Sequence, residues 1–443
     1  MDTRFSLHNT HLEDAKLFAE LDPQLRRLKS QRYQYQSPIL DELPTNIPGI
    51  YTIGGGRQIG KTTLLKQWMQ KLLQQSVPPS AIVFFSGELI DDHHSLIQFI
   101  QTQLAIMPTD RINYLLIDEI TYISDWDKAI KYAADSGLFD NVEVILTGSD
   151  LVFIQEARMR FPGRRGKAAT VNFHLYPLSF RELVQLKHPG IIDPSIDLLF
   201  EEFENYLIHG GYLTAINNLA IEGRISESTL VTYSDWIRGD MLKRGKQDTY
   251  LREILLAIIK RYGTQITWNS LAQDLSIDHP KTIADYVALL ESMDAVFVQA
   301  ALLEDKLTAA PKKARKVMFA DPFIFHAIRA WLNPVKDSFT HQILSLLKNT
   351  IESAKLVECC VVTHYRRFYP TYYIKAEGEV DIAYVNEKRF WPIEIKWTNQ
   401  LREKDLKQIT KYQNGNILTK NRTAGKIQQI PTTPLPLALW NLR

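Results

Sequence analysis

The stretch Ile50–Trp68, IYTIGGGRQIGKTTLLKQW, decides the fold of the first part of the chain. Its apolar start, residues 50–53, predicts a buried strand. The spacing GxxxxGKT then occupies residues 55–62, and apolar residues recur at helical intervals after it. A strand, a glycine loop, Gly-Lys-Thr and a helix, in that order, are the context that the phosphate-binding P-loop requires.

Each residue type in this loop has a physical role in holding phosphate. Glycines let the backbone bend so that its N–H groups converge, and the helix that begins near Lys61 adds its positive end. We expect Lys61 to bind the β- and γ-phosphates and the Thr62 hydroxyl to ligate Mg²⁺. The alternative is a glycine turn that merely leads into an amphipathic helix, and the flanking strand and helix favour nucleotide binding. The residues expected to bind ATP are Gly55, Gly56, Arg57, Gln58, Ile59, Gly60, Lys61, Thr62 and Thr63.

Size and composition indicate an ordinary globular protein. The chain has 443 residues, of which 45% are hydrophobic and 23% charged, and this length allows two or three domains. It contains no apolar run of about 18 residues, and its N-terminus lacks the basic-then-apolar order of a signal peptide, so we expect no membrane partner. Cys359 and Cys360 are the only cysteines, which predicts a reduced, cytoplasmic setting without a disulfide framework.

The charge is distributed unevenly along the chain. From Lys306 to the end there are 23 Lys and Arg against 11 Asp and Glu, whereas the rest of the chain has 29 against 39. A basic C-terminal third on an acidic body suggests a part that faces a polyanion such as nucleic acid. A solvated surface that happens to be basic is an equally good interpretation of the charge alone.

Apolar runs after the P-loop predict a parallel sheet. The runs at residues 81–85, 114–117, 142–146 and 171–176 alternate with helical patterns. Near-continuously apolar strands separated by helices are typical of a parallel sheet that is covered on both faces. In such sheets ligands bind at the carboxyl ends of the strands, which is where the P-loop begins.

Two carboxylates follow the second of these runs. Asp118 comes directly after YLLI, where it can hold Mg²⁺ together with Thr62, and Glu119 can polarise a water that attacks the γ-phosphate. An exposed loop with helix-capping charge is the alternative, and the position after a buried strand argues against it. Glu119 also argues against a small-molecule kinase, because a kinase gains nothing by activating water. Ser149, after VILTG, either senses the γ-phosphate or closes a turn.

The order of short motifs resembles a known family. GGGRQIGKTT, LLIDEI, VILTGS, PGRR and LYPLSFREL follow one another between residues 54 and 183. They are similar to the motifs of AAA+ ATPases of the archaeal-ATPase type, which also occur in bacteria. Gly210-Gly211-Tyr212 extends the resemblance, although Leu213 stands where that group usually has proline.

This resemblance implies ATP hydrolysis, a helical lid over residues 178–245, and assembly into a homo-oligomer, either a ring or a dimer. In such assemblies an arginine from a neighbouring subunit completes each site. By motif position Arg164 or Arg165 would be that arginine, and the motif does not decide between them. The alternative is that PGRR is an exposed basic turn.

Residues 246–305 have the spacing of a helix-turn-helix followed by a strand pair, which predicts a winged helix. Winged helices commonly bind DNA. The candidate recognition helix, however, carries only Lys281 as a strong base and also contains Asp285 and Glu291. We therefore favour a structural or partner-docking role for this domain.

The last domain, residues 306–443, carries a second candidate site. PKKARK, residues 311–316, predicts a basic linker. Further on, a predicted helix contains LVE, and two predicted strands joined by a turn contain EVD and EIK. Residues two apart on a strand share one face, so the acid and the lysine of EIK point to the same side. Charge alternation along an exposed strand is the alternative, but the combined pattern is more specific than a lone ExK.

The pattern resembles the PD-(D/E)xK nuclease fold. The resemblance implies that Asp381 and Glu394 ligate Mg²⁺, that Lys396 stabilises the charged phosphate, and that Glu358 orients the metal or a water. It also matches the C-terminal domain that is usually fused to this type of ATPase. Many such domains have no assigned substrate, so an intact site does not establish cleavage.

The sequence as a whole therefore predicts an α/β protein: a P-loop AAA+ parallel sheet with a helical lid, then a winged helix, then an α/β restriction-endonuclease-like domain. The AAA+ core with an N-terminal extension would span residues 1–177. The predicted function is ATP binding and hydrolysis coupled to a metal-dependent nuclease-like module that acts on nucleic acid. The alternative is a DNA-binding or scaffold protein that is controlled by ATP and does not cleave.

Overall fold

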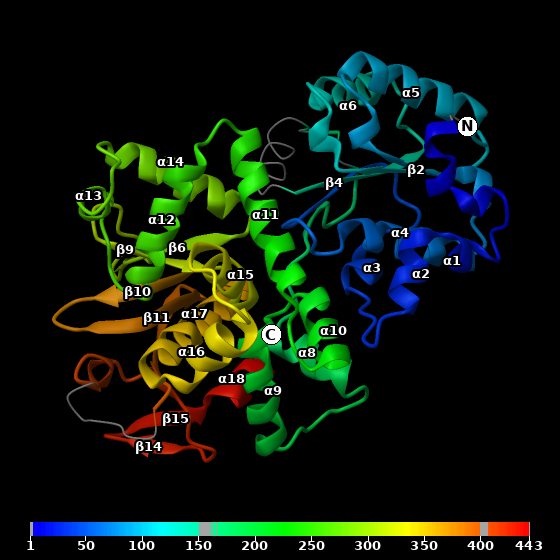
Figure 1. The fold of residues 1–443 in the computed structure, drawn as a ribbon. Helices are drawn as coiled ribbons and strands as arrows, with labels where there is room; N and C mark the ends of the chain where they lie inside the picture. Colours follow the sequence, from blue (N-terminus) through cyan, green and yellow to red (C-terminus); the bar gives the residue numbers. More distant parts are fainter. Residues whose placement is uncertain (1–2, 150–160, 162, 165, 399–405, 443) are drawn as a thin grey trace. The chain divides into compact units, whose positions relative to one another are not determined.

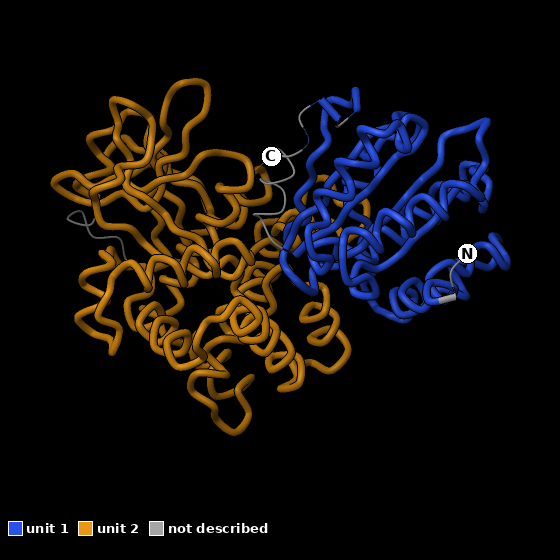
Figure 2. Tube along the Cα trace, turned by 90° about the horizontal axis from the view of Figure 1, so that it is seen from above, with its two compact units in different colours: residues 1–176 blue, residues 177–443 orange. Residues whose placement is uncertain are grey.

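The computed structural model describes residues 3–149, 161, 163–164, 166–398 and 406–442 (Figure 1). The chain divides into two compact units, residues 1–176 and 177–443 (Figure 2). Of the helices in the described part of the chain, none is both long and apolar enough to cross a membrane.

The first unit is built on a five-stranded sheet. Its strands lie in the order β2-β3-β4-β1-β5, and every neighbouring pair is parallel, which confirms the predicted parallel sheet. The strands are β1 (Gly49–Gly54), β2 (Ile82–Ser86), β3 (Asn113–Asp118), β4 (Val142–Gly148) and β5 (Asn172–His174). The order places β4 between the P-loop strand β1 and the strand β3 that ends at Asp118.

Helices cover both faces of this sheet because successive strand residues point to opposite sides. In β2, Val83 and Phe85 pack with α5 (His93–Ile106) and α6 (Trp126–Asp135). Ile82 and Phe84 pack on the other side, with α4 (Lys61–Gln74) and the N-terminal helices. These N-terminal helices are α1 (Phe18–Leu21), α2 (Pro23–Lys29) and α3 (Ile39–Glu42).

The second unit begins with helices, as the sequence predicted for residues 178–245. They are α8 (Phe180–Lys187), α9 (Ile196–His209), α10 (Leu213–Glu222) and α11 (Glu227–Lys243). The turn between α9 and α10 is the predicted Gly-Gly-Tyr motif. A Cβ on Gly210 would lie 1.7 Å from Asp321 Oδ1, and the Gly211 amide donates to Asp321 Oδ2 at 2.8 Å. A buried carboxylate therefore explains why this turn needs glycine.

Three helices and two small antiparallel sheets follow. The helices are α12 (Asp248–Lys260), α13 (Trp268–Ala272) and α14 (Pro280–Ser292). The strands predicted at 295–303 do not pair with each other. Instead β6 (Val296–Ala300) pairs with β9 (Arg315–Phe319), and β7 (Leu302–Leu303) pairs with β8 (Thr308–Ala309). The predicted boundary at 305/306 therefore falls between two strands that are paired.

The prediction of a basic linker at residues 311–316 was wrong at its end. Arg315 and Lys316 belong to β9, and the Lys316 side chain is buried. The apolar residues of β9 are buried in the core, and the strand that they form also includes the two basic residues that precede them. Glu358 and Glu379, from segments later in the chain, neutralise the positive charge of this lysine.

The rest of the second unit is a mixed sheet with helices. α15 (Pro322–Leu332), a π-helical turn (Phe339–Leu344), α16 (Ser345–Lys348) and α17 (Thr350–Phe368) precede it, and α18 (Leu435–Asn441) ends it. The sheet order is β10-β11-β12-β13-β15-β14. Its strands are β10 (Thr371–Lys375), β11 (Glu379–Asn386), β12 (Arg389–Lys396), β13 (Asn416–Thr419), β14 (Gly425–Ile427) and β15 (Ile430–Pro434). The two strands of the hairpin that carries EVD and EIK, β11 and β12, lie side by side and antiparallel.

Candidate functional site

The P-loop connects β1 to α4, as predicted. α4 begins at Lys61, directly after Gly60, so its free N–H groups face the loop. Gly55 has a φ of +151°, and a Cβ there would lie 2.5 Å from the carbonyl oxygen of Leu175. The close approach of the segment after β5 therefore excludes a side chain at this position.

The Lys61 ammonium is held inside the loop. It donates to the carbonyl oxygens of Gly55 at 3.1 Å and Gly56 at 3.0 Å, and it lies 3.4 Å from the Glu119 carboxylate. The side chain is only 4% exposed. The lysine is thus fixed at the centre of the loop beside the carboxylate that the sequence predicts to activate water.

Asp118 is the hub of a network of hydroxyl groups. Thr62 Oγ1 donates to Asp118 Oδ2 at 2.6 Å, and Thr147 Oγ1 donates to Asp118 Oδ1 at 2.6 Å. Burial raises the pKa of Asp118, and the two hydroxyl donors oppose that shift. Thr62 and Asp118, the predicted magnesium ligands, are thus in direct contact. This pair of hard oxygen ligands fits Mg²⁺.

Thr147 is the residue that the sequence analysis missed. Its hydroxyl accepts from the Glu119 backbone amide at 2.9 Å while it donates to Asp118. It lies at the end of β4, next to the β3 residues that it contacts. The available signal was VILTGS, where the hydroxyl of Thr147 was passed over in favour of Ser149. Ser149 is half-buried one residue beyond β4, and its role stays a prediction.

Glu119 has a strained backbone and an available acceptor. Its φ is +50°, in the left-handed region that non-glycine residues seldom adopt. Its Oε2 is buried and has no hydrogen-bond partner in the described parts of the chain. Strain of this kind is concentrated at functional sites. The turn that Thr147 braces therefore presents a carboxylate oxygen for use.

The remaining nucleotide-loop predictions stay predictions. Arg57 stacks over the Tyr122 ring at 5.5 Å and also bonds to its hydroxyl. Gln58 has a left-handed φ of +57°. Ile59 packs partly against the core beneath the sheet, and Thr63 is half-buried in the first turn of α4.

Of the two candidate arginine fingers, the structure describes only Arg164. Arg164 forms a two-point ion pair with Asp135 of the same chain, in which Nη2 and Oδ2 are 3.1 Å apart. Arg165 lies outside the described residues. The finger role stays a prediction for both.

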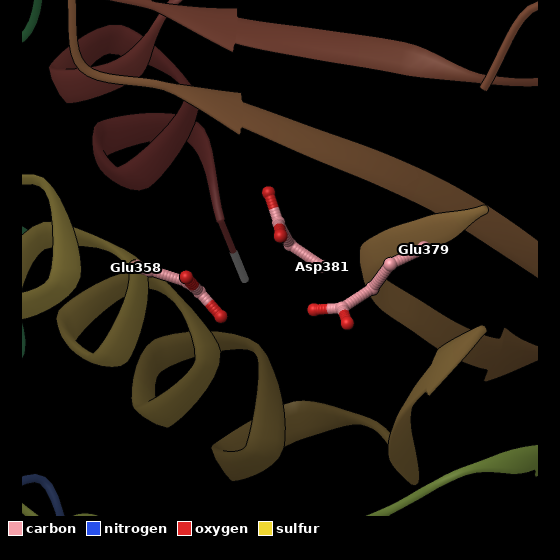
Figure 3. A group of neighbouring side chains, drawn as sticks. All are labelled: Glu358, Glu379 and Asp381. Carbon is pink, nitrogen blue, oxygen red and sulfur yellow. The ribbon is translucent and has the colours of Figure 1, made fainter. Parts of the chain in front are cut away.

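A second polar site lies in the unit formed by residues 177–443. Figure 3 shows three carboxylates that point toward one another, Glu358 from α17 and Glu379 and Asp381 from β11. One oxygen from each lies within 4.8 Å of the others. We call these three residues the acid cluster. Glu358 and Asp381 were predicted, whereas Glu379 was missed, although its position two residues before Asp381 puts it on the same face of the strand.

Glu394 and Lys396 lie on β12, the strand beside β11. Lys396 Nζ donates to Glu394 Oε1 at 2.6 Å, and the Ile395 amide donates to Asp381 Oδ2 at 2.8 Å. Burial, together with the negative charge of Asp381, raises the pKa of Glu394 to about 8. The four predicted residues of this site are therefore neighbours, but the carboxylates closest to Asp381 are those of Glu358 and Glu379 in the acid cluster.

Lys316 reaches the acid cluster from β9. Its Nζ donates to Glu358 Oε1 at 2.7 Å and also pairs with Glu379. Burial and the Asp381 charge raise the pKa of Glu358 to about 7, and the Lys316 ammonium opposes that shift. Carboxylate oxygens fit Mg²⁺ or Mn²⁺, so the residues suit a divalent cation, but a built-in ammonium already occupies two of them.

Two segments of the chain match family models. Residues 48–184 match a family described as "AAA domain", and they contain the whole nucleotide site described above. Over this segment the chain is similar to AAA-type P-loop ATPases. Residues 200–334 match "Domain of unknown function (DUF8612)". The second segment contains Lys316 but none of the acid-cluster carboxylates, and it runs through the predicted boundaries at 245 and 305.

Relatives are distant. An uncharacterized protein of Haemophilus influenzae is 27% identical over 257 residues, and the match spans 55% of this chain and 60% of the relative's length. Among solved structures, a Walker-type ATPase of Pyrococcus abyssi is 15% identical with a TM-score of 0.43, covering 68% of this chain and 97% of its own. Cdc6p of Pyrobaculum aerophilum is 13% identical with a TM-score of 0.28, covering 70% and 94%.

Proposed function

We propose that the protein binds and hydrolyses ATP at its P-loop, and that its second unit contains a metal-dependent nuclease-like module that acts on nucleic acid. The observation that carries the first part is the network Thr62–Asp118–Thr147. This network sets the Glu119 backbone and leaves one carboxylate oxygen of Glu119 unused beside Lys61.

The roles of the residues follow from this geometry. The loop amides and the start of α4 bind phosphate oxygens, and Lys61 supplies a compact positive charge for the transferred phosphate. Glu119 orients and polarises the attacking water. Thr62 and Asp118 would hold Mg²⁺, which, when bound, neutralises charge on the phosphates. A hydrolytic role is preferred to a kinase role, because a carboxylate placed to activate water would waste ATP in a kinase.

The test is ATP binding and turnover in the full chain with Mg²⁺. Lys61→Ala is expected to lose both, whereas Glu119→Gln keeps binding and loses turnover by roughly a hundredfold or more. Thr147→Val is expected to keep ATP binding and to lower turnover less than Glu119→Gln does. It removes the hydroxyl that bonds to the Glu119 amide and to Asp118, and it leaves the P-loop intact. Lys128→Ala, a surface lysine of the same unit, is the matched control. Normal turnover in both Lys61→Ala and Glu119→Gln would refute the proposal.

The acid cluster and the strand beside it support the nuclease-like part. Glu358 and Asp381 belong to the cluster, and Glu394 and Lys396 lie on the neighbouring strand β12. The same third of the chain is basic, which favours a nucleic-acid partner. We propose Asp381 and Glu394 as metal ligands, with Lys396 facing the phosphate. Cleavage of DNA and RNA panels in Mg²⁺ or Mn²⁺ tests this, each with ATP, a non-hydrolysable analogue and no nucleotide. Asp381→Ala and Lys396→Ala should both abolish cutting.

A second candidate function has its own support. Lys316 already neutralises two of the acid-cluster carboxylates, and this favours a DNA-binding or scaffold protein that ATP controls and that does not cleave. Salt-dependent DNA binding without cleavage under every condition of the panel would select this alternative. In either case we propose that residues 246–305 serve as a winged helix with a structural or docking role, because α14 is poor in basic residues.

We also propose a homo-oligomer in which an arginine reaches the neighbouring nucleotide site. Residues 178–245 would act as the lid of each subunit. Arg164→Ala or Arg165→Ala should then lower turnover by roughly a hundredfold or more while leaving ATP binding intact. Sedimentation with and without ATP measures the assembly, and unchanged turnover in both variants argues against the finger.

A further inference from the structure

A lysine ammonium lies within the acid cluster. Glu358, Glu379 and Asp381 each place an oxygen within 4.8 Å of the other two. The Lys316 side chain is 1% exposed, and its ammonium pairs with both glutamates. Three carboxylates so close repel one another, and all three are partly buried, so water screens that repulsion only in part. The ammonium therefore supplies the positive charge that this arrangement needs.

The lysine is held there by its own segment of the chain. It stands on β9, whose partner strand β6 sends Gln299 Nε2 to the Asp381 carbonyl oxygen at 2.9 Å. From the turn before α13, the Gln265 amide bonds to Glu379 Oε2, the oxygen that Lys316 does not take. The ring of Tyr373 lies 5.6 Å from the ammonium. Residues between 265 and 316 thus close over the cluster at three points.

These contacts engage oxygens that a metal would also need. Both oxygens of Glu379 have partners, and so does one oxygen of Glu358. A divalent cation binds deprotonated oxygens that are free to turn toward it. A second positive centre in the same buried space would also be repelled by the ammonium.

The Glu394 carboxylate, on the strand beside the acid cluster, has one oxygen without a hydrogen-bond partner in the described structure. Glu394 is 5% exposed. Within the part of the chain that the structure describes, its Oε2 has no hydrogen-bond partner. Its other oxygen is taken by Lys396. Lys316 pairs with Glu358 and Glu379 and leaves this oxygen of Glu394 without a partner. A buried acceptor of this kind needs a partner, and a bound cation would supply one.

We propose that Lys316 and a divalent cation are alternative occupants of the acid cluster, so that metal binds there only when the ammonium is displaced. This inference rests on the proposed metal site of the nuclease-like module. It adds that the segment carrying Gln265, Gln299 and Lys316 keeps that site closed in the metal-free protein.

The test is a titration of the full chain with Mn²⁺ in the absence of nucleotide, in which electron paramagnetic resonance measures the bound metal. All proteins carry Asp118→Asn, which removes the metal ligand of the P-loop. Lys316→Met deletes the charge and keeps the length of the side chain. Lys313→Met is the matched control, since Lys313 lies on the same segment and is exposed, and its side chain bonds to the Lys375 carbonyl oxygen and not to the acid cluster. Lys316→Met should bind Mn²⁺ roughly tenfold or more tightly than the parent, and Lys313→Met should match the parent.

Thermal unfolding gives a second readout. Without metal, Lys316→Met should melt below the parent, because the carboxylates then repel one another unopposed. Mn²⁺ should restore its Tm while changing that of the parent little. If the variant does not fold without metal, refolding in Mn²⁺ supports the proposal, and failure to fold in Mn²⁺ overturns it, since the metal then cannot replace the lysine.

Equal or weaker Mn²⁺ affinity in Lys316→Met than in the parent also overturns the inference, while leaving the metal site of the proposed function in place. If neither protein binds Mn²⁺, both the inference and that metal site fail. ATP turnover measured in the Lys316→Met chain with native Asp118 is independent of either result, so the nucleotide part of the proposed function is judged separately.

Discussion

At the scale of single residues, the chemistry of both sites depends on how carboxylates are neutralised. Asp118 is buried but accepts two hydroxyl hydrogen bonds. Glu358 is partly buried beside the Lys316 ammonium. Glu143, in the middle of the first sheet, has neither kind of partner in the described structure, since both of its carboxylate oxygens are buried and unbonded. Such a group must be neutral in the folded protein.

Glu143 makes a prediction about pH. Burial raises its pKa from 4.5 to about 9. The folded state therefore binds a proton that the unfolded state releases between these values, so the stability contribution present below about pH 4.5 is lost as the pH rises toward 9. In that pH window the free energy of unfolding of Glu143→Gln should rise, relative to that of the wild type, by up to about 1.4 kcal/mol per pH unit.

Urea unfolding at pH 5 and pH 8 measures this difference in the free energy of unfolding. The exposed Glu88 of the same unit, changed to Gln, is the control, and its difference from the wild type should not depend on pH. Parallel pH profiles for Glu143→Gln and the wild type would contradict the prediction.

At the scale of elements, the N-terminal extension is attached to the P-loop helix by a buried ion pair. Lys66 of α4 lies 3.1 Å from Asp22, and both side chains are at most 1% exposed. The other oxygen of Asp22 accepts from the Gln24 and Leu25 amides at the start of α2. The Lys66 ammonium also lies 3.9 Å from the centre of the Phe84 ring. One lysine thus connects α2, α4 and β2.

Breaking this pair from one side should be costly. Lys66→Met leaves the Asp22 carboxylate buried without a cation, and we expect it to lower the free energy of unfolding by about 3–5 kcal/mol. The double variant Lys66→Met/Asp22→Asn should cost clearly less than the two single changes added together. Lys71→Met, which removes a pair to the exposed Asp41, should cost about 1 kcal/mol or less. Additive effects in the double-mutant cycle would show that the pair does not couple the elements.

Elements were predicted best where apolar periodicity was long. The strands and helices around the P-loop match their predicted ranges closely, because each buries a continuous apolar face. The apolar end LALWNL predicts a final strand, but the structure has helix α18 there, since a short apolar run fits either structure. The pattern of residues 401–412 predicts a helix rich in Lys and Arg. Residues 399–405 lie outside the described structure, and Ile409–Lys411 is a single 3₁₀ turn.

At the scale of the whole molecule, two compact units predict two unfolding transitions. Each unit has its own sheet and core, so each should unfold cooperatively. ATP with Mg²⁺ should raise the Tm of the transition of residues 1–176 and leave the other nearly unchanged, because a ligand stabilises only the unit that binds it. Differential scanning calorimetry measures both. Lys61→Ala is the control that should remove the shift, and one transition that moves as a whole would contradict the prediction.

The sequence by itself predicted nearly all the residues of the candidate nucleotide site. Gly55, Lys61 and Thr62 lie within eight residues, so local backbone geometry is enough to place them, and Asp118 and Glu119 follow at the end of a strand in the same parallel sheet. What it could not determine was the third contact, Thr147, because the neighbour of β3 depends on the strand order rather than on the chain order.

The acid cluster was decided by the tertiary structure. Glu358, Asp381 and Glu394 were recognisable as a spaced pattern, but the pattern could not say which oxygens meet. Lys316 stands 42 residues before Glu358 in the chain, in a stretch that has the composition of a linker. Only the pairing of β6 with β9 brings its ammonium among the carboxylates, because in a buried space the charge that balances an acid can come from any segment that the fold places there.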